Sequence, residues 1–501
     1  MPQLLALQLP PGSGRRATPQ DTRSAWWDMS LVRFDAGELV PIGGWKRLPG
    51  IQLAGEPRSL LSWRDNAGLR WVAGASLGQV QVWDGSAGTV LSPADFVPGE
   101  AAGIVDGYGI GDYGAEPYGV HRSHESEQYR AAPSGSVSLD NWGEDLVAMG
   151  SADGRLLMWT PSLPVAGLLQ PVAGAPPGRA CIVTEERHIV VIGADGDPRR
   201  VSWCSQEVPT DWAPSVTNTA GSLQLRSTGI GLAARRVSQG TIIFCDDDVH
   251  LLAYVGTPYV YGLQRIGAGC GPAGPEAMVA MSGRAAWWGH HGFWLYDGSV
   301  RSLPCPLTEY LESDMNPVLR GSIYGFHNGI FPEITWGYCS AGAATPDSYV
   351  TWNYETNGWW HGRQRRSIGV EPGAFGLPLL GAPDGLIYQH ETGWLDDGNP
   401  RGSSVFAETG DIQIGDGDGG IFVSSLIPDL QHPELVQWHL RGSWAPGDVL
   451  EEYGTYVAER ADGVIDTCFE TRALRLRLEG LQDGPWALGR VRLALDPGAG
   501  R

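Results

Sequence analysis

Residues 146–159 read Leu-Val-Ala-Met-Gly-Ser-Ala-Asp-Gly-Arg-Leu-Leu-Met-Trp, two short apolar runs separated by a polar stretch that contains an Asp-Gly pair. An Asp-Gly pair supplies the positive φ angles that a tight turn between antiparallel strands requires. Short apolar runs bounded by such a turn are typical of a β-hairpin. The stretch therefore predicts two paired strands, the second of which ends near Trp159.

The same order of run, turn and run recurs along much of the chain. It is found at 71–85, 188–203, 242–254, 285–298, 349–360 and 384–388. These repeats lie roughly 40–60 residues apart, which is the length of one blade of a β-propeller. A four-stranded blade cannot bury both of its faces alone, so neighbouring blades must stack in a ring. We therefore expect an all-β protein whose main part is a β-propeller of about five to seven blades, with one short helix starting at 306–311.

The composition supports the all-β class. The chain of 501 residues has 71 glycines and 36 prolines, but also 21 Trp, 16 Tyr and 10 Phe. Disordered chains are poor in aromatic residues, so this chain is expected to fold. Glycine in turns and aromatic side chains between blades fit many short strands joined by tight turns.

Changes in the repeat divide the chain into three parts. We expect an N-terminal segment and arm at 1–50, the propeller at 51–410 with a Gly/Tyr-rich loop at 100–140, and a small C-terminal β domain at 411–501. Residues 473–478 read Ala-Leu-Arg-Leu-Arg-Leu, an alternation that predicts a strand with one buried and one charged face.

The charge argues against a protein that grips nucleic acid. The net charge is −21, and a protein that binds phosphates needs a basic patch. Acidity could aid solubility, or it could line a passage from which DNA is repelled, and the sequence leaves both open. The single lysine, Lys46, lies in a turn-like stretch and is interpreted as structural.

The cysteines are widely spaced and form no Cys-x-x-Cys pair. They are Cys181, Cys204, Cys245, Cys270, Cys305, Cys339 and Cys468. Zinc sites and disulfide frameworks need clustering or regular spacing, so buried free thiols in a reducing cytoplasm are expected. The first residues have no basic region of a signal peptide, and no apolar run is long enough to span a membrane. We expect a soluble protein made in the cytoplasm.

Three metal-like or catalytic motifs are incomplete. Residues 416–419 open like a calcium loop, but the twelfth position is Ile427, which cannot ligate. His390-Glu391 lacks the second histidine of a zinc protease motif. His290-His291 lies in a predicted hairpin turn with no acidic neighbour in sequence and is interpreted as a surface turn.

Adjacent carboxylates also fail as a catalytic pair. Asp396-Asp397 and Glu451-Glu452 would point to opposite faces of a strand, so they cannot act on one substrate as acid and base. Nucleophile-elbow and phosphate-loop motifs are absent from the sequence. We therefore expect no enzyme, and no catalytic, cofactor-binding or metal-binding residue.

A family resemblance is carried by several stretches in a fixed order. They are Asp-Pro-Arg-Arg-Val-Ser-Trp-Cys at 197–204, Pro-Thr-Asp-Trp-Ala-Pro-Ser at 209–215, Thr-Asn-Thr-Ala-Gly at 217–221 and Tyr-Val-Gly-Thr-Pro-Tyr-Val at 254–260. In this order the chain resembles the tail-hub, or phage stabilisation, proteins of short-tailed bacteriophages. The resemblance implies a structural subunit of the virion tail that has no catalytic residues.

The resemblance also implies partners. Such a protein forms a ring of its own copies, commonly a hexamer, which extends the DNA channel below the portal and adaptor rings and bears a tail needle, fibre or spike. Genomic DNA passes without sequence-specific binding, and nothing inserts into a membrane. Loop residues Tyr108, Tyr113 and Tyr118 are the expected subunit contacts. The alternative is a carbohydrate-binding or glycan-cleaving propeller, because aromatic rings stack on sugars and acids can cleave them.

Overall fold

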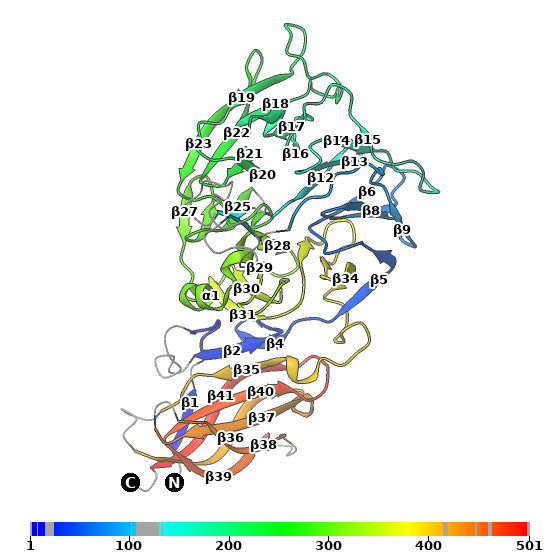
Figure 1. The fold of residues 1–501 in the computed structure, drawn as a ribbon. Coiled ribbons are helices and arrows are strands. Elements are labelled where there is room, and N and C mark those ends of the chain that lie inside the picture. Colours follow the sequence, from blue (N-terminus) through cyan, green and yellow to red (C-terminus); the bar gives the residue numbers. More distant parts are fainter. Residues whose placement is uncertain are drawn as a thin grey trace, which may run out of the picture.

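Most of the chain belongs to two β units (Figure 1). The computed structural model describes residues 3–7, 9–15, 25–101, 103–106, 130–132, 134–281, 283–413, 419–445, 448–458 and 463–497. Within these residues, seven four-stranded antiparallel sheets form one unit, and a five-stranded and a six-stranded sheet form the other. The all-β class and the propeller are confirmed, with the blade number at the upper end of the expected range.

Six blades are continuous in sequence. From the centre outwards they are β6 (Ser59–Arg64), β7 (Arg70–Ser76), β8 (Gln79–Trp83), β9 (Gly88–Val90); β12 (Val137–Trp142), β13 (Asp145–Gly150), β14 (Leu156–Trp159), β15 (Gln170–Pro171); β16 (Ala180–Val183), β17 (Ile189–Ile192), β18 (Arg200–Trp203), β19 (Gly221–Gln224); β20 (Gly231–Val237), β21 (Gly240–Cys245), β22 (Asp248–Gly256), β23 (Val260–Ala268); β24 (Met278–Met281), β25 (Arg284–Gly289), β26 (Gly292–Tyr296), β27 (Val300–Leu303); and β28 (Tyr324–Asn328), β29 (Glu333–Tyr338), β30 (Ser348–Asn353), β31 (Gly358–Arg363). The hairpin predicted at 146–159 is the pair β13–β14.

The seventh blade joins two distant parts of the chain. It consists of β32 (Ile368–Val370), β33 (Leu379–Gly381), β34 (Leu386–His390) and the N-terminal strand β5 (Trp45–Gln52). Trp45 is paired with His390, and Gln52 with Leu386. The first strands of all seven blades contact one another in the order β6, β12, β16, β20, β24, β28, β32 and back to β6. Pairing of β5 therefore closes the ring with backbone hydrogen bonds.

Aromatic side chains fill the spaces between blades. Trp71 on β7 meets Trp159 on β14 edge to face, with ring centroids 5.6 Å apart. Phe244 on β21 meets Trp287 on β25 in the same way at 5.2 Å. Such pairs stabilise the contact beyond the area that they bury, by about 0.5–1.5 kcal/mol. The expected role of the recurring aromatics is confirmed at these contacts.

The second unit is a pair of packed sheets, here called the two-sheet unit. The six-stranded sheet has the order β3 (Val32–Asp35), β4 (Glu38–Pro41), β41 (Ala487–Pro497), β36 (Ile421–Gln431), β39 (Ile465–Thr471), and β1 (Gln3–Leu7) also pairs with β41. The five-stranded sheet has the order β2 (Trp26–Ser30), β35 (Phe406–Thr409), β40 (Ala473–Gly480), β37 (Val436–Ser443), β38 (Glu451–Tyr456). On β40 the leucines at 474, 476 and 478 are fully buried, while Arg475 pairs with Asp411. The alternation predicted at 473–478 is therefore confirmed.

The boundary expected at residue 50 needs correction. We expected 1–50 to be a segment and arm, but β1 to β4 are strands of the two-sheet unit and β5 belongs to the propeller. The strand β35, expected in the propeller, also lies in the two-sheet unit. The physical reason is that sheet edges need partners, and here the N-terminal strands supply them to strands more than 350 residues away.

The two units are joined through the blade β28–β31 (Figure 1). His361 Nε2 lies 3.1 Å from Asp28 Oδ1, and the Leu31 amide donates to the Tyr349 hydroxyl at 3.0 Å. Both pairs link the strand β2 and its end to the propeller. The junction is therefore made of specific polar contacts whose propeller side chains are buried, whereas the Asp28 side chain is 37% exposed.

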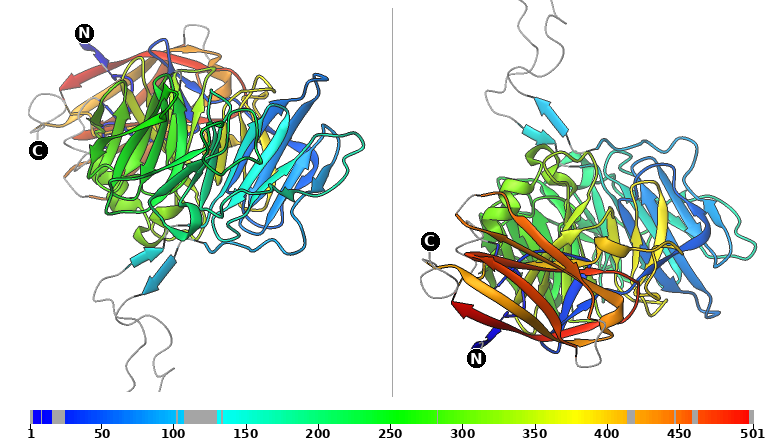
Figure 2. Two further views of the ribbon diagram at one scale, coloured as in Figure 1. Left: turned by 90° about the horizontal axis from the view of Figure 1, so that it is seen from above. Right: turned by 90° about the horizontal axis from the view of Figure 1, so that it is seen from below.

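A hairpin projects from the propeller (Figure 2). It consists of β10 (Gly103–Asp106) and β11 (Arg130–Ala132). The expected contact residues Tyr108, Tyr113 and Tyr118 follow β10 in sequence and lie outside the described residues.

The expected helix is confirmed as α1 (Thr308–Asp314). Short 3-10 turns are η1 (Ala194–Gly196), η2 (Pro317–Ser322), η3 (Gly402–Ser404) and η4 (Pro433–Leu435). Over the described residues, the helices are all too short or too polar to cross a membrane.

Candidate functional site

A cavity lies on the axis of the propeller. Its volume is about 390 Å³, and residues of all seven innermost strands line it. Cavities of about 300–1,000 Å³ are the size that holds a small molecule. The wall combines aliphatic side chains, Met281, Leu139 and Ile182 among them, with polar and charged ones. Its charged side chains come from β12, β20 and the ends of neighbouring strands.

One charged pair crosses from β20 to β12. Arg236 contacts both oxygens of Asp140, Nη1 at 2.7 Å from Oδ2 and Nη2 at 3.1 Å from Oδ1. The same guanidinium donates to the Val183 carbonyl at 2.6 Å, and the Val183 amide donates to Asp140 at 2.8 Å. Arg236 therefore holds three adjacent blades together at the cavity wall.

A second pair crosses from β20 to Glu276, two residues before β24. Arg235 Nη2 lies 2.8 Å from Glu276 Oε2. Burial raises the pKa of the Glu276 carboxyl, against the opposing effect of Arg235. Both arginines of the wall are thus engaged by carboxylates.

The cavity is too small and too balanced in charge for a DNA passage. Its acids Asp140 and Glu276 each have an arginine partner, and Glu371 lies 3.4 Å from His327 Nδ1. A wall that repels phosphates would need uncompensated acids. The acidic passage considered from the sequence is therefore not this cavity.

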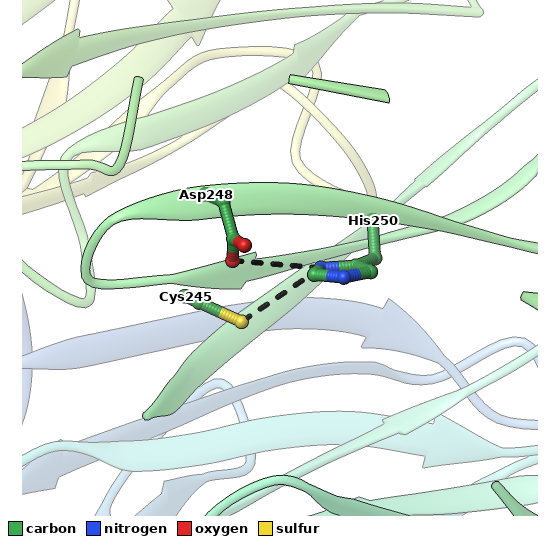
Figure 3. Close-up of side chains that lie close together, drawn as sticks. All are labelled: Cys245, Asp248 and His250. Carbon is green, nitrogen blue, oxygen red and sulfur yellow. Dashed lines mark hydrogen bonds and ion pairs between the residues drawn. The ribbon is translucent and has the colours of Figure 1, made fainter. Parts of the chain in front are cut away.

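Three buried side chains form a separate group on the blade β20–β23, here called the turn cluster: Cys245, Asp248 and His250 (Figure 3). His250 Nδ1 lies 3.9 Å from Cys245 Sγ and 3.6 Å from Asp248 Oδ1. Burial lowers the pKa of His250, with Asp248 opposing, and burial raises the pKa of the Cys245 thiol. Among the described residues, this group has the donors and spacing to hold a metal ion.

Sequence reasoning passed over the turn cluster because it looked for Cys-x-x-Cys pairs. The signal is Cys-x-x-Asp-x-His at 245–250. In a hairpin with a two-residue turn, the last residue of the first strand lies opposite the first residue of the second. Side chains two apart on a strand share a face, which adds His250. The spacing could therefore have predicted the cluster.

The residues that the sequence singled out lie in structural positions. Lys46 is exposed on β5, opposite Gln389, so it lies on a strand and not in the expected turn. His290 and His291 form the exposed turn between β25 and β26, as expected. The thiols at 181, 204, 245, 270 and 339 are free and buried, whereas Cys305 is partly buried and Cys468 is exposed. The predicted calcium-like opening at 416–418 lies outside the described residues.

His390 and Glu391 belong to the junction between the two units. His390 accepts from Arg366 Nε at 2.9 Å, and Glu391 Oε2 accepts from the Gly43 amide at 2.9 Å. A Cβ on Gly43 would lie 2.6 Å from Glu391 Cα, so only glycine fits there. Asp396 accepts from the Trp45 indole, which gives this acid a structural partner too.

Among the comparisons with known proteins, only the comparison with solved structures finds similar proteins. No protein-family model matches the chain, and no curated protein sequence matches it. The WD40 domain of Neurospora crassa Pan2 is similar over 69% of this chain and 94% of its own, at 10% identity and a TM-score of 0.38.

Two further solved structures are similar over a comparable part of the chain. An inactive virginiamycin B lyase from Staphylococcus aureus matches 68% of this chain and 97% of its own, at 6% identity and a TM-score of 0.39. YCF48 from Cyanidioschyzon merolae matches 70% and 98%, at 10% identity and a TM-score of 0.36. The sheet topology of the chain itself shows a β-propeller with an added two-sheet unit.

Proposed function

We propose that the chain is a structural subunit of a bacteriophage tail, a hub, adaptor or nozzle ring that extends the DNA channel. The ring links the portal and adaptor rings to a needle, fibre or spike. The ordered stretches between 197 and 260 support this proposal. The observation that carries it is the union of a closed propeller and a two-sheet unit through buried polar contacts, because such a subunit resists deformation.

The size of the central cavity bears on where DNA would pass in the proposed ring. A volume of about 390 Å³ is that of a small-molecule pocket, so the proposal puts the DNA channel between copies of the chain, along the axis of the ring. The net charge of −21 suits passage without sequence-specific binding. The subunit would be made in the host bacterial cytoplasm and reside in the virion tail, without membrane insertion or catalysis.

The proposed subunit contact is tested by serine substitution of Tyr108, Tyr113 and Tyr118 together. We expect a folded monomer with an unchanged melting temperature that fails to enter particles. The matched control is Tyr259→Ser, which removes a propeller tyrosine that is 79% exposed. Normal assembly and infectivity of the triple variant would refute the contact.

A glycan-directed propeller is the second candidate, favoured by the ligand-sized cavity. It has less support because sugar rings stack on exposed aromatic faces, and few such faces line the cavity. Among the described lining residues the aromatic rings are those of Phe326 and His327. Release of sugar from a capsule extract by the purified monomer would favour this candidate. Recovery of the chain only within particles would favour the tail ring.

A further inference from the structure

The turn cluster is produced by a two-residue turn. Cys245 is the last residue of β21 and Asp248 the first of β22, and Phe244 pairs with Val249. Cys245 and Asp248 therefore lie opposite each other, and His250 follows on the same face of β22. The donor atoms of all three side chains lie within 4.8 Å of one another (Figure 3).

These donors are buried without adequate partners. The exposed fractions are 0% for Cys245, 2% for Asp248 and 1% for His250. Asp248 Oδ1, which faces His250 Nδ1, has no hydrogen-bond partner. The cation beside Asp248 is Arg265, whose Nη1 lies 4.0 Å from Oδ2. A buried polar group without a partner is costly, and a buried charge is more so. The site thus lacks a positive group at its centre.

We propose that the turn cluster binds one divalent transition-metal ion of the zinc class through Cys245 Sγ, His250 Nδ1 and an Asp248 oxygen. Zinc takes this set of ligands, at about 2.0–2.3 Å from each atom. Tetrahedral angles at such lengths put the ligand atoms about 3.3–3.6 Å apart. The 3.9 Å and 3.6 Å separations therefore need to close by a few tenths of an ångström. The third separation, from Cys245 Sγ to the Asp248 oxygen, lies within 4.8 Å and needs to close by at most about 1.2 Å.

Charge balance also favours a dication. Binding replaces the thiol proton, which leaves to solvent, so thiolate and carboxylate together neutralise two positive charges. The complex is neutral, which is the form that a buried position tolerates. One position of a tetrahedron remains for water. Because the ligands bridge the ends of β21 and β22, we expect the bound ion to stabilise this blade.

The experiment uses the full-length chain, reduced and refolded with one equivalent of Co²⁺ or Zn²⁺ so that the buried site can load. We expect one metal per chain by elemental analysis. We also expect a thiolate-to-cobalt charge-transfer band, and release of about one proton per Zn²⁺ bound at a pH below the thiol pKa. Bound metal should raise the melting temperature by mass action.

Two variants and a control make the test specific. Cys245→Ser should abolish the charge-transfer band, and Asp248→Asn should weaken binding at least tenfold; far-ultraviolet circular dichroism verifies that each is folded. Cys339→Ser removes a buried thiol of another blade and should bind as the wild type does. A folded wild type without stoichiometric metal would overturn the site. So would binding that survives in both folded variants.

Discussion

Two buried charged groups in this molecule differ in how completely they are paired. The first, here called the junction triad, consists of Arg33, Glu333 and Glu391. Arg33 lies between the acids, 3.0 Å from Glu333 and 2.6 Å from Glu391. In the turn cluster, the Asp248 carboxylate faces a single arginine at 4.0 Å.

The difference separates a structural contact from a candidate ligand site. The triad joins β3 of the two-sheet unit to the propeller, and Glu391 also accepts from the Gly43 amide. Both carboxylates have Arg33 as a close cation, which they share. The turn cluster has metal-ligating donor atoms but no cation among them. The free energy of unfolding should therefore depend on whether a metal ion is bound there. Removing a charge from the junction triad should therefore lower the stability of the protein, whereas removing the Asp248 charge from the metal-free turn cluster should not.

The largest effect is expected for Arg33→Ala. This change leaves Glu333 and Glu391 buried without their cation, and loss of one partner of a buried pair costs about 3–5 kcal/mol. The free energy of unfolding, measured by urea denaturation, should fall by that amount. A loss no greater than that of an exposed pair would contradict the assigned role of the triad.

The pH dependence of stability should change in Glu333→Gln. Burial, with Glu391 adding to it against Arg33, raises the pKa of Glu333 to about 7. The unfolded carboxyl has a lower pKa, so the folded state binds the extra proton between the two values. This contribution is fully present below about pH 4.5 and is lost as pH rises through about 7.

The measurement is the difference in unfolding free energy between wild type and Glu333→Gln across pH 5 to 8. It should favour the variant increasingly with pH, by at most about 1.4 kcal/mol per pH unit. Taking the difference removes the contribution of buried histidines such as His390, whose pKa is lowered by burial. A constant difference would show that Glu333 stays ionised.

A smaller effect of opposite sign is expected for Asp248→Asn without metal. The change removes a buried charge that lacks a close partner, so the metal-free chain should be equally or more stable, by up to about 1–2 kcal/mol. With one equivalent of Zn²⁺ the order should reverse. Thermal unfolding with and without the ion measures both. Destabilisation of the metal-free chain would place Asp248 with the junction triad, as a structural charge.

The smallest effect is expected for Arg301→Ala. Arg301 lies 2.6 Å from Asp297, but its side chain is 61% exposed. Exposed pairs contribute about 0–1 kcal/mol because water screens them. Urea denaturation of this variant is the exposed-pair reference for Arg33→Ala. If the two variants lost similar unfolding free energy, burial could not explain the large effect expected for Arg33→Ala.

Local features of the fold could be predicted from sequence because their causes are local. The Asp-Gly pair at 153–154 predicts the turn between β13 and β14, and alternation at 473–478 predicts β40. Pairing of β5 with β34 could not be predicted in this way, because its partners are more than 300 residues apart. The same holds for the strands β1 to β4.

The two buried charged groups also differ in whether their residues are close together in the sequence. The turn cluster lies within six residues and could have been recognised from Cys-x-x-Asp-x-His. The junction triad could not, because Arg33, Glu333 and Glu391 meet only after both units have folded. His390-Glu391 resembles part of a zinc motif in sequence, whereas its role in the structure depends on Gly43 and Arg366.

The central claim is that the chain is a ring subunit of a phage tail. Its most direct test is quantitative mass spectrometry of purified particles produced by the genome that encodes the chain. We expect the chain in the particles at a fixed copy number relative to the portal protein, consistent with one closed ring. Particles that contain portal protein but none of this chain would contradict it.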